Sequence, residues 1–430
     1  MNYKIAFNAF FRRLFNLRYL FVLIRTTSLV LAAFLLFGFS EPVKEKTPAE
    51  TQWVGTWATA PQLVEKQNMP PAPGLTNNTL RQVVCVSVGG KKVRLHFSND
   101  YSTSPVTIKS VQIAVSKGDS LIDEGTTQKL QFGGKDDYTM QPGTEVISDP
   151  ISFDLKPRAL VAITICLGET SQTVTGHPGS RTTSYIVEGN HSEKGADFSK
   201  AARTDHWYIV TGIDVEASKN ATATVAILGD SITDGRGSGT NKQDRWPDVL
   251  AMNLQKDAKT KSIGVLNLGI GGNAVLRGGL GPYALSRYDR DILKQSGVKW
   301  VIIYEGVNDL GGTRDSTVAF QVAQGLIDAY TKMIADAHNQ GLKIYGATIT
   351  PFKRNGYYRT YRDAARNMIN DWIRTSGKFD ALIDFDKTVR DPKDPAKLLD
   401  EAQAGANDYL HLNEMGYRMM GGSIDLGLFK

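Results

Sequence analysis

An apolar run that ends in Gly229-Asp230-Ser231 constrains the fold of this chain more than any other stretch. The run, from Thr224 to Leu228, carries no charge and is rich in β-branched residues, as expected of a strand buried on both faces of a parallel sheet. Ligands bind at the carboxyl ends of strands in open α/β sheets. Ser231 is therefore a candidate nucleophile, although a serine after a strand is more often a turn or N-cap residue.

The residues after Ala221 alternate between apolar strands and amphipathic helices. This alternation predicts a doubly wound α/β domain with a five-stranded parallel sheet, in which right-handed crossovers place helices on both faces. The loops that follow the strands then meet along one edge of the sheet. We expect strands at 224–228, 263–268, 299–304, 342–348 and 381–385, and helices near 246–256, 284–296, 316–339, 361–376 and 414–421.

The region before residue 217 has a different pattern, made of short strands separated by turn residues. A run from Val83 to Val88 ends at Gly89-Gly90, which is a hairpin signal, and an alternating run from Val93 to Phe97 follows. We expect an all-β sandwich domain of jelly-roll type over residues 53–216. A polar linker is expected at 41–52, and the α/β domain at 221–430.

Residues 1–40 form a basic and then apolar leader. They contain five basic residues and no acidic one, and they end in an apolar run from Ser28 to Ser40. This order is typical of a secretory signal peptide, and the run is short for a membrane span of about 20 residues. An uncleaved signal anchor is the alternative. We expect a secreted or periplasmic protein that contacts a membrane only through the leader, if the leader is retained.

The leader also accounts for most of the positive charge of the chain. The net charge is +6, and five of these charges lie in residues 1–40. The remainder of the chain is close to neutral and has no basic patch on which nucleic acid could bind. We therefore expect no nucleic-acid partner.

Two cysteines, Cys85 and Cys166, lie in β-branched runs of the predicted sandwich. In an exported protein they could form one disulfide. Two separate buried thiols are the alternative, because the sequence does not show whether their Cα atoms lie close together.

Polar residues and glycines follow other predicted strands at the same edge as Ser231. Gly272 follows the second strand, where a glycine allows the backbone to approach a ligand. Asn308 follows the third strand and could donate a hydrogen bond. Asp408 and His411 lie three residues apart after the fifth strand. The predicted topology therefore brings a serine, an amide, a carboxylate and an imidazole together.

These four pieces resemble the blocks of the SGNH (GDSL) hydrolase superfamily, which are Gly-Asp-Ser, a glycine, Gly-x-Asn-Asp and Asp-x-x-His. They stand in the family's order over about residues 222–425. The resemblance implies a flavodoxin-like α/β fold and a serine ester hydrolase. The stretches at 245–247 and 281–285 also resemble bacterial GDSL hydrolases that carry a β-domain in front.

The resemblance also assigns roles to individual residues. Ser231 would be the nucleophile, His411 the general base, and Asp408 the group that holds the imidazole. The oxyanion hole would consist of the backbone N–H groups of Ser231 and Gly272 and the side-chain amide of Asn308.

Three neighbouring residues are expected to support the loops. We assign Asp230 and Asp309 to bracing them and not to chemistry. Asn273 stands where many relatives of the family have an aspartate, which could alter the bracing without removing the donor at Gly272.

Other chemistries have weaker support in the sequence. Asp384 and Asp386 could suggest a metal site with His411, but no pair of histidines or cysteines has ligand spacing, so we expect no metal. The glycines at 278–281 follow no strand directly, which argues against a dinucleotide loop, and we expect no cofactor. Four further histidines fall in the predicted sandwich, where packing is the default role: His96, His177, His191 and His206.

Together these features predict an exported serine esterase that removes a short acyl group, acetyl in particular, from a small-molecule or polysaccharide ester. Arg277, Tyr283 and Tyr357 lie on loops that could close over the acyl side and leave room for a methyl group. The aromatic residues after the fourth strand, which are Phe352, Tyr357, Tyr358 and Tyr361, are either core residues or a wall for sugar stacking.

Two alternatives stay open at this point. The first is a lipase or acylhydrolase that acts on longer acyl esters. The second is a non-catalytic glycan-binding protein, in which the sandwich binds and the α/β domain has lost its activity.

Overall fold

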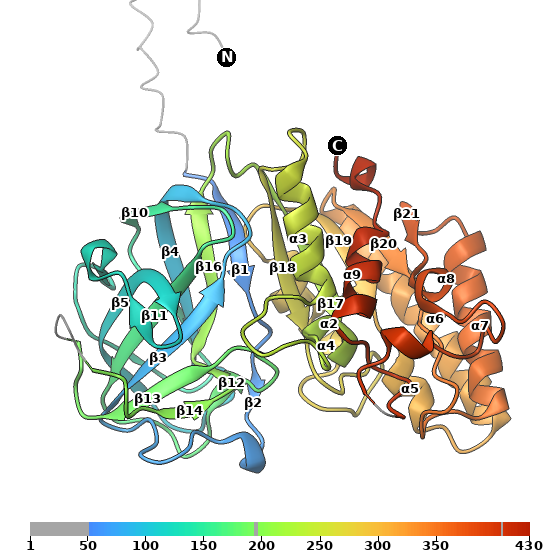
Figure 1. Cartoon of the computed structure of the whole chain (residues 1–430), viewed down its shortest axis with the longest axis horizontal. Coiled ribbons are helices and arrows are strands. Elements are labelled where there is room, and N and C mark those ends of the chain that lie inside the picture. The colour runs from blue at the N-terminus through green and yellow to red at the C-terminus, as the bar shows by residue number, and fades with distance from the viewer. Residues whose placement is uncertain (1–50, 193–196, 406) are drawn as a thin grey trace, which may run out of the picture. The chain divides into compact units, whose positions relative to one another are not determined.

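Residues 51–192, 197–405 and 407–430 are described by a computed structural model of the chain (Figure 1). The predicted leader at 1–40 and nearly all of the predicted linker at 41–52 lie outside these residues. Within the described ranges, no helix combines the length and the apolar character that a membrane span requires.

The parallel sheet forms as the alternation predicts, in the order β18-β17-β19-β20-β21 with every neighbouring pair parallel. Within β17, Val225 and Ile227 belong to the hydrophobic cluster on one face of the sheet, whereas Ala226 and Leu228 belong to the cluster on the other. This two-sided burial explains why the run has no charged position. The strands are β17 (Ala223–Gly229), β18 (Ile263–Gly269), β19 (Val298–Tyr304), β20 (Lys343–Ala347) and β21 (Ala381–Ile383).

Helices cover both faces of this sheet (Figure 1). On one face lie α3 (Trp246–Lys256), α8 (Phe385–Val389) and α9 (Glu414–Gly422). On the other lie α4 (Ala284–Tyr288), α5 (Val307–Gly311), α6 (Ser316–Asn339) and α7 (Thr360–Thr375). The prediction of a doubly wound α/β fold is therefore confirmed.

The structure differs from the predicted bounds by more than one residue at two of these elements. The fifth strand ends at Ile383, because the Asp384 side chain accepts a hydrogen bond from the Lys387 N–H and starts α8 there. The helix expected at 284–296 is α4 followed by a π-helical turn, η3 (Asp289–Leu293). That turn carries Arg290, which contacts Asp100 of the sandwich at 3.0 Å.

Two antiparallel sheets face each other in the region before residue 217. The first contains β1 (Trp53–Ala58), β16 (Val210–Glu216), β4 (Gly90–Ser98), β10 (Ile151–Leu155) and β9 (Glu145–Ile147). The second contains β14 (Ala202–Thr204), β13 (Ser184–Glu188), β3 (Asn78–Cys85), β11 (Leu160–Leu167), β5 (Val106–Gly118), β6 (Leu121–Ile122), β7 (Gln128–Leu130) and β8 (Tyr138–Met140). A small third sheet joins β15 (Trp207–Tyr208), β12 (Thr175–His177) and β2 (Gln62–Leu63).

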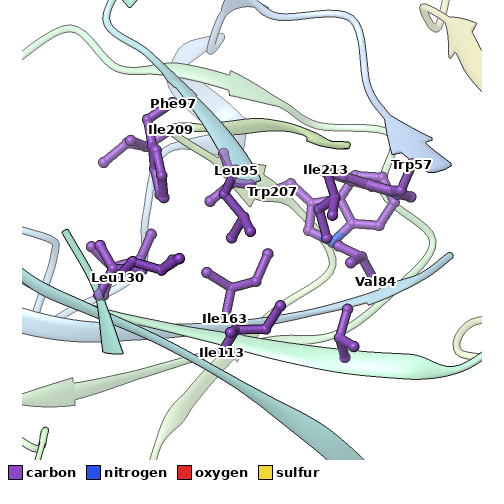
Figure 2. Packing of buried hydrophobic residues seen from close by; sticks show 14 of the residues in the cluster. Trp57, Val84, Leu95, Phe97, Ile113, Leu130, Ile163, Trp207, Ile209 and Ile213 are labelled. Carbon is purple, nitrogen blue, oxygen red and sulfur yellow. The ribbon is translucent and has the colours of Figure 1, made fainter. Parts of the chain in front are cut away.

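The sandwich is held together by apolar side chains that point inward from both sheets. Leu95 and Ile213 from the first sheet face Ile113 and Ile163 from the second, and all four are fully buried (Figure 2). Burial of this kind is the main stabilising contribution to an all-β domain. The predicted all-β region before the α/β domain is confirmed.

The two cysteines lie far apart on one strand pair. In the β3–β11 ladder, Cys85 pairs with Leu160 and Cys166 pairs with Thr79, so the cysteines stand at opposite ends. Both are buried free thiols, and burial raises the pKa of Cys85 to about 11. Of the two expectations, separate buried thiols describe this protein.

The sandwich and the parallel sheet meet along the edge strand β18, and Thr51–Lys430 form one compact unit. The Val265 N–H donates to Ser87 Oγ at 2.9 Å. A Cβ atom at Gly264 would lie 2.2 Å from the Gly55 carbonyl oxygen, so this approach requires a glycine. The sandwich thereby covers a sheet edge that would otherwise be open.

Candidate active site

The turn after β17 places Ser231 at the carboxyl edge of the sheet. Ser231 begins α2 (Ser231–Asp234), and the Asp230 side chain caps this helix by accepting from the Ile232 N–H at 2.9 Å. The turn is tight, because a Cβ atom at Gly229 would lie 2.1 Å from Thr233 Oγ1. Helix α2 ends at Gly235, whose φ of 101° is in the left-handed region that favours glycine.

Ser231, His411 and Asp408 form a continuous chain of hydrogen bonds. Ser231 Oγ lies 2.9 Å from His411 Nε2, and His411 Nδ1 lies 3.1 Å from each carboxylate oxygen of Asp408. An ionised carboxylate only accepts, so Nδ1 donates and Nε2 is left to take the serine proton. This is the arrangement that nucleophilic catalysis by a serine needs.

The carboxylate of Asp408 is fixed by its own loop. One oxygen accepts from the backbone N–H groups of Leu410 at 3.0 Å and His411 at 2.7 Å. Burial raises the pKa of Asp408, but the hydrogen bonds from the His411 ring and from these N–H groups outweigh it and hold the pKa well below its usual range. Asp408 is thus ionised at neutral pH and favours one tautomer of His411.

The predicted oxyanion donors line the same pocket as Ser231 and His411. This pocket has a volume of about 350 Å³. The Asn308 Nδ2 group donates to the Asn273 carbonyl oxygen at 2.7 Å, and Asn308 Oδ1 accepts from the Tyr357 hydroxyl at 3.1 Å. These two contacts fix the plane of the amide. An amide nitrogen has two N–H groups, so the second can serve a ligand.

The loop after β18 is braced as the sequence suggested for Asp309. The carboxylate of Asp309 accepts from the N–H groups of Val275 and Leu276 at 2.9 and 3.0 Å. Asn273 donates to the Leu280 and Pro282 carbonyl oxygens.

The Asn273 side chain also accepts from the Arg287 guanidinium at 2.9 Å. An ionised aspartate at this position could accept from Arg287 but could not donate to the two carbonyl groups. Asparagine therefore fits the contacts of this particular loop.

Several carboxylates are buried beneath the site. Burial raises the pKa of Asp230 to about 7, and the nearby charge of Asp309 adds to the effect. Burial also raises the pKa of Glu305 well above its usual value, and Glu305 lies 3.6 Å from Arg287. One guanidinium thus faces several acids, which favours protonation of some of them.

The other residues predicted from the sequence are spread around the site. Tyr357 lines the active-site pocket, whereas Arg277 lines a neighbouring cavity of about 520 Å³ that also reaches Asn308. Tyr283 lines neither cavity and its side chain is exposed. Among the aromatic residues after β20, Phe352 is a core residue with Tyr358 packed against it.

The pocket has a second wall that the sequence did not reveal. Polar side chains from the sandwich region line it, and they come from short segments without a recognisable motif. These residues are Gln62, Glu65, Asn68, Arg181 and His206. Only the close packing of the two regions brings them to Ser231, and no signal in a single sequence reports such packing.

Asp384 and Asp386 are engaged elsewhere in the domain. Asp384 pairs with Arg374 at 2.8 Å, and Asp386 pairs with Arg366 at 2.7 Å. In the part of the chain that the structure describes, no group of three or more histidine, cysteine, aspartate or glutamate residues is placed to hold a metal ion.

A doubly wound α/β domain with a serine at the end of a parallel strand, beside a histidine and an aspartate, defines a class of serine hydrolases. Residues 227–419 match the model of the GDSL-like Lipase/Acylhydrolase family. The chain carries a GDSL-like hydrolase domain and is a serine ester hydrolase, as the resemblance predicted. No curated protein matches the chain.

Several solved structures are similar to the chain. A GDSL-like lipase from Bacteroides thetaiotaomicron is 18% identical, with 48% of this chain and 88% of that chain covered and a TM-score of 0.34. A family two carbohydrate esterase from Cellvibrio japonicus is 10% identical, with 88% and 95% covered and a TM-score of 0.36. A carbohydrate esterase family 2 enzyme plus carbohydrate binding domain from Corynascus thermopiles (Myceliophthora fergusii) is 14% identical, with 85% and 97% covered and a TM-score of 0.35.

Substitution of Asn308 tests the predicted oxyanion hole. In Asn308→Ala we expect kcat to fall about 100-fold or more with little change in KM, because an oxyanion donor acts mainly in the transition state. Steady-state kinetics on p-nitrophenyl acetate measure both constants. Asn253→Ala, which removes a half-buried amide on α3, is the matched control. A change in KM alone would make Asn308 a substrate-binding group instead.

The raised pKa of Asp230 predicts a pH-dependent stability. Its pKa is about 7 in the folded protein and about 4 in an unfolded chain, so the folded state binds more protons between these values. Stability therefore falls as the pH rises from about 4 to about 7. Asp230→Asn keeps an acceptor for the Ile232 N–H and removes this loss.

The gain in the free energy of unfolding for Asp230→Asn should be larger at pH 8 than at pH 5, by on the order of 2 kcal/mol. Urea unfolding at the two pH values measures it, with Asp289→Asn at an exposed position as the control. An equal gain at both pH values would show that ionisation of Asp230 does not oppose folding.

Proposed function

We propose that the protein removes short acyl groups, acetyl in particular, from carbohydrate esters, with Ser231, His411 and Asp408 as its catalytic triad. The observation that carries this proposal is the hydrogen-bonded chain from Ser231 Oγ to Asp408, which opens into a pocket with a polar second wall. The triad supports the chemistry, and the polar wall supports the substrate class.

In the first half of the reaction, Ser231 Oγ attacks the carbonyl carbon of the ester and His411 Nε2 takes the hydroxyl proton. The tetrahedral intermediate places its negative oxygen at the N–H groups of Ser231, Gly272 and Asn308. Each such donor contributes about 3 kcal/mol to transition-state stabilisation. When the intermediate collapses, the bond to the alcohol oxygen breaks and His411 gives its proton to the leaving alcohol.

In the second half, water attacks the acyl-Ser231 ester and His411 takes a proton from the water. The same oxyanion donors serve the second intermediate. Collapse breaks the bond to Ser231 Oγ, returns the proton to the serine and releases the short carboxylic acid. Asp408 stays ionised throughout and stabilises the imidazolium that forms twice in each cycle.

The lining of the pocket supports a carbohydrate as the alcohol. Arg181, His206, Gln62 and Asn68 from the sandwich region line the same pocket as Ser231. A sugar can offer hydroxyl groups to these side chains. An aliphatic alcohol would desolvate them without replacing their hydrogen bonds to water, which is unfavourable.

A second candidate is the hydrolysis of longer acyl esters, which a specific observation favours. The cavity of about 520 Å³ next to Asn308 has apolar residues in its lining: Ala274, Leu276, Val318 and Val322. If the acyl chain entered this cavity, each buried methylene would add about 0.8 kcal/mol of binding.

A series of p-nitrophenyl esters from two to eight carbons distinguishes the candidates. We expect kcat/KM to be highest for acetyl and to fall with chain length, and we expect acetate to be released from acetylated polysaccharides. Ser231→Ala is the control and should abolish both activities. A steady rise of kcat/KM with chain length would favour the acylhydrolase and leave the triad unaffected.

We also propose that the protein is exported, because the basic and apolar pattern of residues 1–40 is that of a signal peptide. A secreted or periplasmic location agrees with a polysaccharide ester as substrate. Fractionation of the producing cells, with sequencing of the mature N-terminus, tests this. Recovery of the full-length chain in the cytoplasm would contradict it.

A further inference from the structure

The helix that carries Ser231 is tied to the sandwich region by a buried histidine–aspartate pair. Asp234 is the last residue of α2, and its Oδ1 lies 2.9 Å from His177 Nε2 in β12. The other ring nitrogen, Nδ1, lies 2.9 Å from the Ala60 carbonyl oxygen, after β1. Both side chains are almost fully buried, with 4% and 2% exposed.

The partners of the His177 ring fix its position. A carbonyl oxygen only accepts a hydrogen bond, so the ring donates to Ala60 through Nδ1 and shares a hydrogen bond with the Asp234 carboxyl group through Nε2. Polar groups buried in this way are stable only while they remain paired.

The chain that follows His177 encloses Asp234 more closely. A Cβ atom at Gly179 would lie 1.8 Å from Asp234 Oδ2, so the backbone of this loop rests directly on the carboxylate. Arg181 approaches the same oxygen at 3.6 Å. Gly179 and Arg181 also line the active-site pocket, so one short segment contacts both the pocket and the end of α2.

Helix α2 needs such support because it is a single turn. Isolated turns of helix are unstable in water, and Ser231 must keep its hydroxyl within hydrogen-bonding distance of His411. The strand β17 fixes the amino end of α2. At the other end, Asp234 acts together with Thr233, which accepts hydrogen bonds from Trp246 Nε1 at 3.3 Å and from Asn267 Nδ2 at 2.8 Å.

We propose that His177 is a positioning residue for Ser231, which makes the sandwich region part of the catalytic apparatus. This inference rests on the proposed role of Ser231 as the nucleophile. His177 does not touch the substrate. It acts through Asp234, whose position sets the orientation of α2 and so the direction in which Ser231 Oγ points.

The chain contains a control for this histidine–aspartate pair. His96, also in the sandwich, pairs with Asp214 at 2.8 Å, and Asp214 accepts from Ser296 Oγ at 2.7 Å. Ser296 precedes β19, at the amino end of the parallel strands and opposite the edge that carries Ser231. Both pairs lie at the seam, but His96 and Asp214 both belong to the sandwich and reach the α/β domain through Ser296, whereas His177 contacts α2 directly.

The test compares His177→Ala, His177→Gln and His96→Ala in the full-length protein. Two measurements are made on each variant. The first is kcat and KM for hydrolysis of p-nitrophenyl acetate, and the second is the rate at which a serine-directed phosphonate modifies the protein. In His177→Ala we expect kcat and the phosphonylation rate to fall together by about 100-fold, because a displacement of about 1 Å can have this effect. KM should change less than about threefold. His177→Gln, which can still donate to Asp234, should recover part of the loss, and His96→Ala should keep its kcat.

Thermal unfolding of each variant separates positioning from general stability. If His96→Ala loses as much kcat as His177→Ala, or if folded His177→Ala keeps the wild-type kcat, the inference is wrong. If His177→Ala does not fold, His177→Gln and Asp234→Asn decide the matter, since wild-type kcat in both would also contradict it.

Ser231→Ala is assayed in parallel. Activity in that variant would overturn the proposed nucleophile, whereas an inactive Ser231→Ala beside a fully active His177→Ala would overturn only the role of His177.

Discussion

The buried guanidinium of Arg287 is the interaction on which the geometry of the site most depends. It donates to the Leu268 carbonyl oxygen at 2.7 Å and to the Gly229 carbonyl oxygen at 3.2 Å, at the ends of two neighbouring strands. It also donates to Asn273 Oδ1 at 2.9 Å, in the loop that presents Gly272. Because a guanidinium is planar and carries five donors, one side chain fixes both the turn that carries Ser231 and the loop that carries Gly272.

Burial of the Arg287 guanidinium is electrostatically unfavourable, and buried carboxylates close to it offset this cost. Arg287 is fully buried and lies 3.2 Å from Asp291 and 3.6 Å from Glu305. Asp230 is also buried nearby, and its raised pKa shows that this position opposes a full negative charge. Active sites often retain groups that are unfavourable for stability because their positions serve the chemistry. Here Asp230 also caps α2 at Ser231. The carboxylate whose burial is unfavourable is therefore the same group that holds the turn with Ser231.

Local sequence patterns were sufficient to predict most elements of the α/β domain, because the spacing of apolar residues there matches the faces that are buried. The charge-free run of β17 reports burial on both faces, and long helices such as α6 repeat their apolar positions over many turns. Short elements such as α2 contain too few residues to show any period. Asp408 and His411 could be recognised as a pair because they lie three residues apart in one loop. His177 could not be distinguished from other histidines of the sandwich, because its partner Asp234 is 57 residues away in the sequence and belongs to another region of the fold.

The seam between the two regions also explains why the pocket has its present composition. The α/β domain supplies Ser231, His411 and Asn308 to this pocket, and the sandwich supplies the segments around Glu65 and Arg181. The same seam holds the edge strand β18 through Ser87. Under the proposed function, a change in the sandwich that alters substrate preference would therefore also act on the packing that supports Ser231. Specificity and catalytic geometry would then be coupled, because one interface serves both.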